Sequence, residues 1–356
     1  MALSDQVLTL GQWLLAKYGE RVHKIALDAG MTCPNRDGSK GVGGCTFCNN
    51  ASFSPNSADD AACAPAVAAP AGVTDARLAR KRLPATLAEQ LDSGRRAIAR
   101  RTGARKFLAY FQAYTNTYAD IARLRALYDE ALAHPDVIGL SVGTRPDCVP
   151  DAVLDLLAGY RAQGCEVWLE LGLQSAFDDT LARVNRGHGF AEYEATCRAA
   201  RARGLPVCAH LILGLPGETD WHARQSLNRV LAVGVDGLKL HPLHVVRHTV
   251  LAQQWRRGDY APMVLEDYVR LAADLIERTP AEVVYHRVTG TAGADILLAP
   301  AWCRHKWRVL DGIAAELARR GTRQGSRAVH RDEAGAAPAG LSGAGAAVIR
   351  ALAQPV

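Results

Sequence analysis

The stretch that decides the fold is VHKIALDAGMTCPNRDGSKGVGGCTFC, residues 22–48. Residues 22–27 have the composition of a β-strand, and a glycine-rich loop follows them at 30–50. The loop carries three cysteines, Cys33, Cys45 and Cys48. Because glycine lets a backbone turn tightly, the stretch predicts a strand whose following loop folds closely around a bound group.

Three cysteines in one loop point to a metal. Thiolates that converge on one point repel each other unless a cation lies between them. A structural zinc site needs four protein ligands, and His23 would supply the fourth only by pointing out of the preceding strand. An iron–sulfur cluster also normally takes four cysteines, but three ligands leave one metal position open for a functional partner. The ligand count favours a cluster over zinc, and zinc over unligated thiols.

Working outward, strand and helix patterns alternate along the chain. The expected strands are residues 22–27, 107–111, 137–142, 166–173, 206–213 and 237–241. The expected helices between them are residues 86–101, 119–133, 151–163, 191–203 and 218–233. Such alternation is typical of βαβ units and a parallel sheet. The sheet would be open and doubly wound or an incomplete barrel, and its function would lie at the carboxyl ends of the strands.

The flanking segments have other patterns. A short amphipathic helix is expected at 6–18, ahead of the first strand. Residues 54–84 are rich in alanine and proline, with few large apolar side chains, so we expect a mobile surface insertion there. Past residue 242 the pattern predicts helices at 265–278 and 312–320 and a short strand near 283–288.

Composition restricts the class of protein. The chain has 356 residues, 49% of them apolar, and a net charge of +6, which excludes collagen-like, coiled-coil and wholly disordered proteins. The charge permits an anionic partner without arguing for one. We see no signal peptide and no apolar run of transmembrane length. Nine cysteines in a reducing cytoplasm indicate metal or catalytic roles rather than disulfides.

Several motifs carry a resemblance to a known family. They are Gly143–Asp147 (GTRPD), Glu170–Ser175 (ELGLQS), Asn185–His188 (NRGH), His210–Pro216 (HLILGLP), Leu238–Pro242 (LKLHP), Tyr285–Arg287 (YHR), Tyr110–Tyr114 (YFQAY) and Trp302-Cys303. With the cysteine loop, they make the chain resemble the radical S-adenosylmethionine (radical SAM) superfamily, and within it the YhcC-like subgroup. The long first cysteine spacing is similar to that of the radical SAM domain in the catalytic subunit of Elongator.

The resemblance implies a fold and two cofactors. The fold would be an incomplete parallel (β/α)6 barrel of radical SAM type with a small C-terminal α/β extension. The core would span 15–257, including the insertion, the extension 258–325, and a disordered tail 326–356. Cys33, Cys45 and Cys48 would ligate a [4Fe–4S] cluster whose fourth iron binds S-adenosylmethionine (SAM). Reduction would then split SAM and release a 5′-deoxyadenosyl radical.

The resemblance also implies SAM contacts. The candidates are Phe47 at the adenine, Gln112 and Thr115 at the methionine amino end, Gln174, Arg186 at the carboxylate and His210 at the ribose. All but Gln174 have a plainer alternative: core packing for Phe47 and His210, a polar loop for residues 112–116, and a surface ion pair for Arg186. Lys239, His241 and Tyr285–Arg287 are substrate-side candidates. Cys303 is either a packing residue or a substrate-facing thiol.

Partners follow from the same resemblance. Elongator suggests a tRNA wobble-uridine side chain as substrate, hence tRNA modification, and a radical SAM enzyme needs an electron donor such as flavodoxin or ferredoxin. We expect a cytoplasmic protein with no membrane partner. Three basic clusters would suit phosphate contacts: Arg77/Arg80/Lys81/Arg82, Arg95/Arg96/Arg100/Arg101/Arg105/Lys106 and Arg319/Arg320/Arg323/Arg327. The alternatives are a small-metabolite substrate and a non-catalytic, zinc-stabilised RNA-binding protein.

Overall fold

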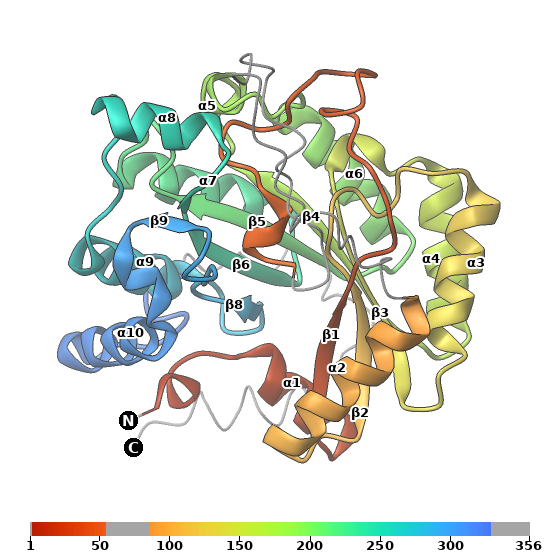
Figure 1. The fold of residues 1–356 in the computed structure, drawn as a ribbon. Coiled ribbons are helices and arrows are strands. Elements are labelled where there is room, and N and C mark those ends of the chain that lie inside the picture. Colours follow the sequence, from red (N-terminus) through yellow and green to blue (C-terminus); the bar gives the residue numbers. More distant parts are fainter. Residues whose placement is uncertain (1, 55–85, 329–356) are drawn as a thin grey trace.

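Seven parallel strands form one curled sheet in the computed structural model, which describes residues 2–54 and 86–328 (Figure 1). Their order is β1 (Val22–Leu27), β2 (Lys106–Phe111), β3 (Val137–Thr144), β4 (Glu166–Gln174), β5 (Val207–Leu213), β6 (Gly237–Pro242) and β8 (Val284–Arg287). Each strand pairs in parallel with the next, which leaves β1 and β8 at the two edges. The predicted incomplete parallel barrel is confirmed, and β8 adds a seventh strand to it.

Helices cover the outer face of the sheet. They are α2 (Leu87–Thr102), α3 (Ile121–Leu132), α4 (Asp151–Ala162), α6 (Phe190–Ala202), α7 (Asp220–Val233) and α9 (Leu265–Arg278). Side chains alternate along each strand. On β4, Leu169 and Leu171 belong to the large apolar core shared with the helices, whereas Glu170 between them bonds to side chains from β1, β5 and β6. The core therefore lies outside the sheet, and polar groups line its inner face.

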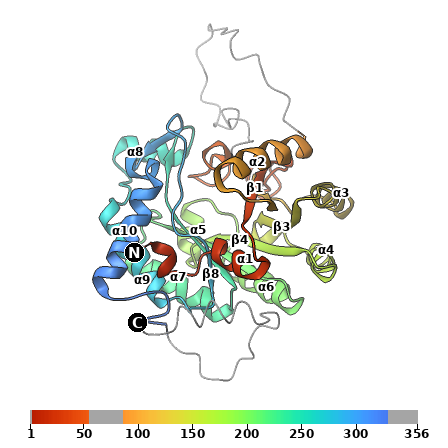
Figure 2. The ribbon, with the colours of Figure 1, turned by 90° about the horizontal axis from the view of Figure 1, so that it is seen from below.

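The N-terminal segment closes one end of the barrel. After a 3-10 turn (Leu3–Asp5), α1 (Leu10–Tyr18) lies across that end, as Figure 2 shows from below. The Trp13 and Trp168 rings meet edge to face at 5.5 Å. Leu8 N–H donates to Gln324 Oε1 at 2.9 Å, so the N-terminal segment also contacts the last part of the described chain. With one end plugged, the site is restricted to the carboxyl ends of the strands.

Some elements differ from the sequence prediction. α10 (Lys306–Arg320) begins six residues before the expected start at Gly312. A Cβ on Gly312 would lie 3.0 Å from Val269 Cγ2, so this glycine permits close packing of α10 on α9. The sequence patterns missed α5 (Asp178–Arg183), α8 (Val250–Arg257) and the antiparallel pair β7 (Val245–Val246) and β9 (Leu297–Ala299). These pieces are too short for periodicity to register.

Part of the prediction is not tested. Most of the 54–84 insertion and nearly all of the tail lie outside the described residues. The division into a core and an extension at residue 258 stays a prediction, although β8 of the extension pairs with β6 of the core.

Candidate functional site

The cysteine loop sits at the carboxyl end of β1. Cys45 is buried, and Cys33 and Cys48 are half-buried. Burial, together with the neighbouring Cys45 and Cys33, raises the pKa of the Cys48 thiol to about 11, although Arg36 opposes the shift. Arg36 also donates through Nη2 to the Cys48 carbonyl at 2.7 Å. The three thiols therefore gather at one place, under the influence of a nearby cation.

This geometry does not suit a zinc ion. Sulfurs bound to one zinc at ~2.3 Å would lie within ~4 Å of one another. In the described chain, the one trio of candidate ligand atoms within 4.8 Å of one another is Glu170, Cys208 and His286, so the loop thiols are spread more widely. His23 is not a fourth ligand either, because it is the second residue of β1 and the cysteine loop follows the other end of that strand. A larger cluster fits the spread thiols better.

Arg186 reaches the thiols from the loop after α5. Its Nη1 donates to Cys45 Sγ at 3.5 Å, and Nη2 donates to the Gly172 carbonyl on β4. Two hydrogen bonds connect the Arg186 loop to the cysteine loop. Thr46 N–H donates to Val184 O at 3.0 Å, and Asn185 Nδ2 donates to Gly44 O at 2.8 Å. The surface-ion-pair alternative for Arg186 is wrong, because its side chain is buried against a cysteine.

Arg145 and Asp147 hold this arrangement together. Arg145 is 2% exposed and grips Asp147 with Nε and Nη2, both at 2.9 Å. Its Nη1 donates to the Arg186 carbonyl at 2.7 Å. Burial alone would raise the pKa of Asp147, but hydrogen bonds from Arg145 and Lys40 hold it at about 2. Sequence reasoning assigned these residues no role, although the GTRPD motif that contains them was the available signal.

The loop after β2 supplies an unpaired hydroxyl. Thr115 is fully buried, its N–H donates to Thr32 O beside Cys33, and its Oγ1 has no partner among the described residues. Gln112, at the start of the same loop, is half-buried. Such an orphaned group beside the thiols suits a polar ligand.

Two more predicted residues border the thiols. Gln174 ends β4 with a φ of 80°, and its Nε2 lies close to Arg186 Nη2: a Cβ built on Gly172 would be 2.9 Å from both. Gly172 therefore leaves the space in which these two side chains converge. Phe47 packs half-buried on an apolar cluster that includes Val184, Ile212 and Leu243. Its position over the ends of β5 and β6 agrees with either of its predicted roles.

His210 belongs to a different group, inside the barrel. Its Nε2 is 2.8 Å from Glu170 Oε2, and burial, followed by Lys239, lowers the pKa of His210 to about 4. Glu170 is fully buried and also accepts from Lys24, Lys239 and Ser141. Burial alone would raise the pKa of Glu170, but the Lys239 and Lys24 ammonium groups hold it well below its usual range. The Glu170 carboxylate already accepts from two ammonium groups, so Glu170, Cys208 and His286 are not a metal site.

The remaining candidates divide between this interior and the core. His286 lies 3.3 Å from Glu170 Oε1, and Lys239 donates to the Tyr110 hydroxyl at 2.8 Å. His241 is next to His244, and Tyr285 is buried against Thr279. Cys303 is completely buried among Val246, Ile296 and Leu297, which supports its packing role. No helix in the described ranges is long and apolar enough to cross a membrane.

Comparisons with known proteins identify the family of the chain. The profile of the Radical SAM superfamily matches residues 33–230, and that of the Radical_SAM C-terminal domain matches 235–319. Protein YhcC of Escherichia coli K12 is 48% identical over 307 residues, covering 86% of this chain and 91% of that protein.

Two further relatives match a smaller part. A tRNA uridine(34) acetyltransferase of Dehalococcoides mccartyi is 35% identical over 155 residues, or 42% of this chain and 33% of that protein. The solved structure of an N-terminally truncated Elp3 from Methanocaldococcus infernus covers 66% of this chain and 59% of its own, with a TM-score of 0.53 and 20% identity. The family profile covers more than half of the chain and begins at its first loop cysteine. The chain therefore belongs to the radical SAM superfamily, and it is a radical SAM enzyme that uses a [4Fe–4S] cluster and SAM.

Proposed function

We propose that Cys33, Cys45 and Cys48 ligate the [4Fe–4S] cluster and that Arg186 and Thr115 bind SAM beside it. The observation that carries this assignment is the contact between Arg186 Nη1 and Cys45 Sγ, which puts a guanidinium next to one thiol of the three-cysteine loop. Bound together, the cluster and SAM supply a 5′-deoxyadenosyl radical. Guanidinium groups pair well with carboxylates, so Arg186 would hold the SAM carboxylate.

The other residues at the site have supporting roles in this proposal. The buried Thr115 hydroxyl and the Gln112 amide would accept from the SAM ammonium group. Gln174, beside Arg186, would contact the same end of SAM, and Phe47 would pack on the adenine. His210 is neutral at pH 7 and bonded to Glu170, so it would offer its free ring nitrogen to the ribose rather than a charge.

We propose a tRNA uridine as the substrate. The support is the likeness of residues in the core to a tRNA uridine(34) acetyltransferase, which covers less than half of this chain. The electron would come from an acidic carrier such as flavodoxin or ferredoxin. The eight described cysteines are all free thiols, which supports a reducing cytoplasm as the site of action.

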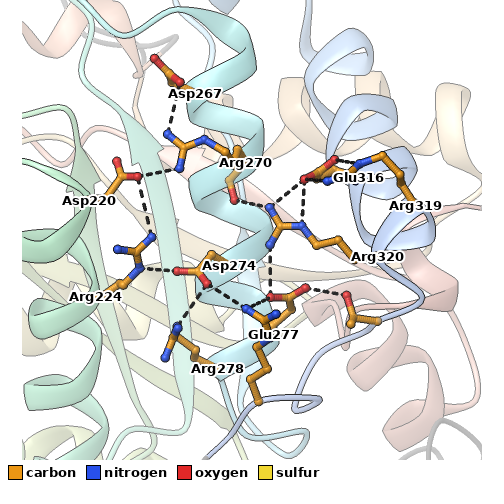
Figure 3. Close-up of polar contacts among 12 residues, drawn as sticks. Asp220, Arg224, Asp267, Arg270, Asp274, Glu277, Arg278, Glu316, Arg319 and Arg320 are labelled. Carbon is orange, nitrogen blue, oxygen red and sulfur yellow. Dashed lines mark hydrogen bonds and ion pairs between the residues drawn. The ribbon is translucent and has the colours of Figure 1, made fainter.

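The three basic clusters are unequal candidates for phosphate contacts. Arg319 and Arg320 bond to Glu316, and Arg320 also bonds to the buried Glu277, within the ion-pair network between α7, α9 and α10 (Figure 3). Arg95 pairs with Asp136, and Arg105 and Lys106 pair with Glu20. Residues 77–82 lie outside the described residues. Arg327 likewise pairs with Asp274 and Glu277. Basic side chains that already pair with carboxylates are weaker candidates for phosphate contacts. Among the described residues of these clusters, this leaves Arg96, Arg100, Arg101 and Arg323.

Iron content tests the ligand assignment. Wild type, purified and reconstituted without oxygen, should hold about four irons per chain. Cys33→Ala, Cys45→Ala and Cys48→Ala should each lose the cluster absorbance and most of the iron. Cys165→Ala, a half-buried cysteine outside the loop, should keep both. Full iron in the three variants, or zinc alone in wild type, would contradict the assignment.

SAM affinity tests Arg186. Losing one charge-assisted hydrogen bond costs about 1.5–3 kcal/mol, so Arg186→Ala should weaken SAM binding about 10- to 150-fold in equilibrium dialysis of the reconstituted protein. Arg183→Ala, which removes an exposed arginine of α5 bonded to Pro216 O, is the matched control and should bind SAM as wild type does. Equal affinity in the two variants would remove Arg186 from the SAM site.

A further inference from the structure

A cleft of about 1040 Å³ opens between the cysteine loop and the C-terminal extension. Its walls are residues 51–54, which follow the loop, Arg287 at the end of β8, residues 291–293 beyond it, and residues 304–308, which lead into α10. The basic and histidine residues that line it are Arg287, Arg304, His305, Lys306 and Arg308. Its described lining contains neither Asp nor Glu. The cleft is therefore a concave, strongly positive surface beside the proposed cluster.

The charges in this cleft lack carboxylate partners. Across the described residues, Arg287, Lys306 and Arg308 form no ion pair, unlike the arginines of the α9–α10 network in Figure 3. Arg304 donates only to main-chain carbonyls, including Leu297 O at 3.0 Å. Desolvation, then Arg287 and Arg101, lowers the pKa of Lys306. Like charges held together without a counter-charge favour binding of an anion.

The cleft also presents an aromatic platform. The Trp307 side chain is 72% exposed, and Lys306 Nζ lies 5.6 Å from its ring centre. Exposed aromatic rings next to basic side chains are the combination with which proteins bind single-stranded nucleic acid, because bases stack on the ring while cations contact phosphates. A folded acidic protein would bury about 800 Å² of this chain's surface in a standard interface. A cleft with a volume of about 1040 Å³ instead suits a ligand of a few nucleotides.

The cleft leads toward the barrel. Arg287 is the last residue of β8 and pairs in register with Lys239 on β6, which bonds to Glu170 inside the barrel. The Arg287 charge also affects buried barrel groups, since it contributes to the lowered pKa of His241 after burial and His244. One residue thus borders both the surface cleft and the interior.

We propose that this cleft binds a single-stranded RNA segment and leads one nucleotide to the barrel mouth. Lys306, Arg308 and Arg304 contact phosphates, a base stacks on Trp307, and Arg287 stands at the passage inward. This inference rests on the proposed RNA substrate and assigns its binding surface to residues outside all three basic clusters considered above.

Fluorescence anisotropy with a labelled RNA hairpin that has the stem and loop of an anticodon arm tests the proposal. Lys306→Ala/Arg308→Ala should weaken binding and lower the slope of log affinity against log salt by about 1.4, or 0.7 for each lost phosphate contact. Trp307→Ala should weaken binding about tenfold with an unchanged slope, because it removes stacking and not charge. A blunt duplex of the same stem should bind more weakly than the hairpin.

Matched variants serve as controls. Arg125→Ala/Arg161→Ala removes the same charge from α3 and α4, and Trp221→Ala removes a 54% exposed tryptophan from α7. Both should bind the hairpin as wild type does. If the cleft variants bind no differently from these controls, or if wild type does not bind the hairpin, the cleft assignment is overturned. It is also overturned if the cleft variants keep RNA binding and lose only their reduction by flavodoxin.

A second readout separates this inference from the proposed radical function. Wild type, cleft variants and controls should all release 5′-deoxyadenosine from SAM at the same rate with dithionite, because none of the changes touches the cysteine loop. If the protein cleaves SAM but does not bind RNA in the cleft, the RNA-binding proposal is refuted and the proposed cluster and SAM site stand. Absence of SAM cleavage in wild type would refute the proposed cluster and SAM site.

Discussion

At the residue scale, the barrel interior is organised by one carboxylate. Glu170 accepts hydrogen bonds or ion pairs from Lys24, Lys239 and His210, and every one of these groups is brought to it by a different strand. Burial lowers the pKa of Lys24 to about 8, so it is still mostly protonated at pH 7. Two ammonium groups thus share one buried carboxylate inside the barrel.

Removing that carboxylate should be costly. In Glu170→Gln two buried cations lose their counter-charge, and breaking a buried pair from one side costs about 3–5 kcal/mol of unfolding free energy. Glu194→Gln removes the exposed partner of Arg198 on α6 and should cost at most about 1 kcal/mol. Urea unfolding at pH 7 measures both. Equal midpoints for the two variants would show that Glu170 is not a structural centre.

Residues of the site differ in how far the sequence predicted them. The cysteines could be identified because their spacing and type carry the chemistry directly. Arg145 could not be identified in this way. It donates hydrogen bonds to Asp147 and to the Arg186 carbonyl, and the second of these bonds depends on how two loops are placed in the folded protein. His210 was placed near the ribose, and its bond to Glu170 was missed because it links residues 40 apart on neighbouring strands.

At the scale of elements, ion pairs bind the outer helices together. Arg224 of α7 bonds to Asp274 of α9, and Arg320 of α10 bonds to Glu277 of α9 (Figure 3). Glu277 is completely buried and also accepts from the Thr322 hydroxyl at 2.6 Å. Strand boundaries were well predicted because buried parallel strands are short apolar runs with clear limits. The start of α10 was predicted too late because close packing of Gly312 on Val269 overrides the low helix preference of glycine there.

Glu277→Gln should therefore loosen α10. Removing one partner of a buried pair should lower the unfolding free energy by about 3–5 kcal/mol, and amide exchange should rise first in α10. Asp267→Asn, which affects an exposed pair with Arg270 on the same helix, should cost no more than about 1 kcal/mol. Hydrogen exchange followed by mass spectrometry would show the difference, and unchanged protection of α10 would contradict the prediction.

At the scale of the whole molecule, the extension is part of the sheet. β8 pairs with β6, and the α9 residues Tyr268, Leu271, Leu275 and Ile276 lie in the same apolar core as the strands. Gln324 donates to Pro280 O and Val283 O while accepting from Leu8 N–H. The core and the extension share one apolar interior.

A chain that ends at Arg257 should not fold cooperatively. It would lose β8 and α9, expose the edge of β6 and uncover apolar side chains, a combination that promotes aggregation. A chain that ends at Ala328 keeps every described element and should unfold at the wild-type midpoint. Circular dichroism during urea titration distinguishes the two. A cooperative transition at the wild-type midpoint for the shorter chain would show that the core is autonomous.

The tie between Leu8 and Gln324 also has a consequence for biosynthesis. The two residues are 316 positions apart, so the ribosome must make nearly the whole described chain before this bond can form. At about 5–20 residues per second, the wait is roughly 15–60 s. Strands β1 to β6 can pair in the order of their synthesis, because the sheet follows the sequence. The plug under the barrel is completed last, which makes the nascent amino terminus the part of the fold that chaperones have longest to bind.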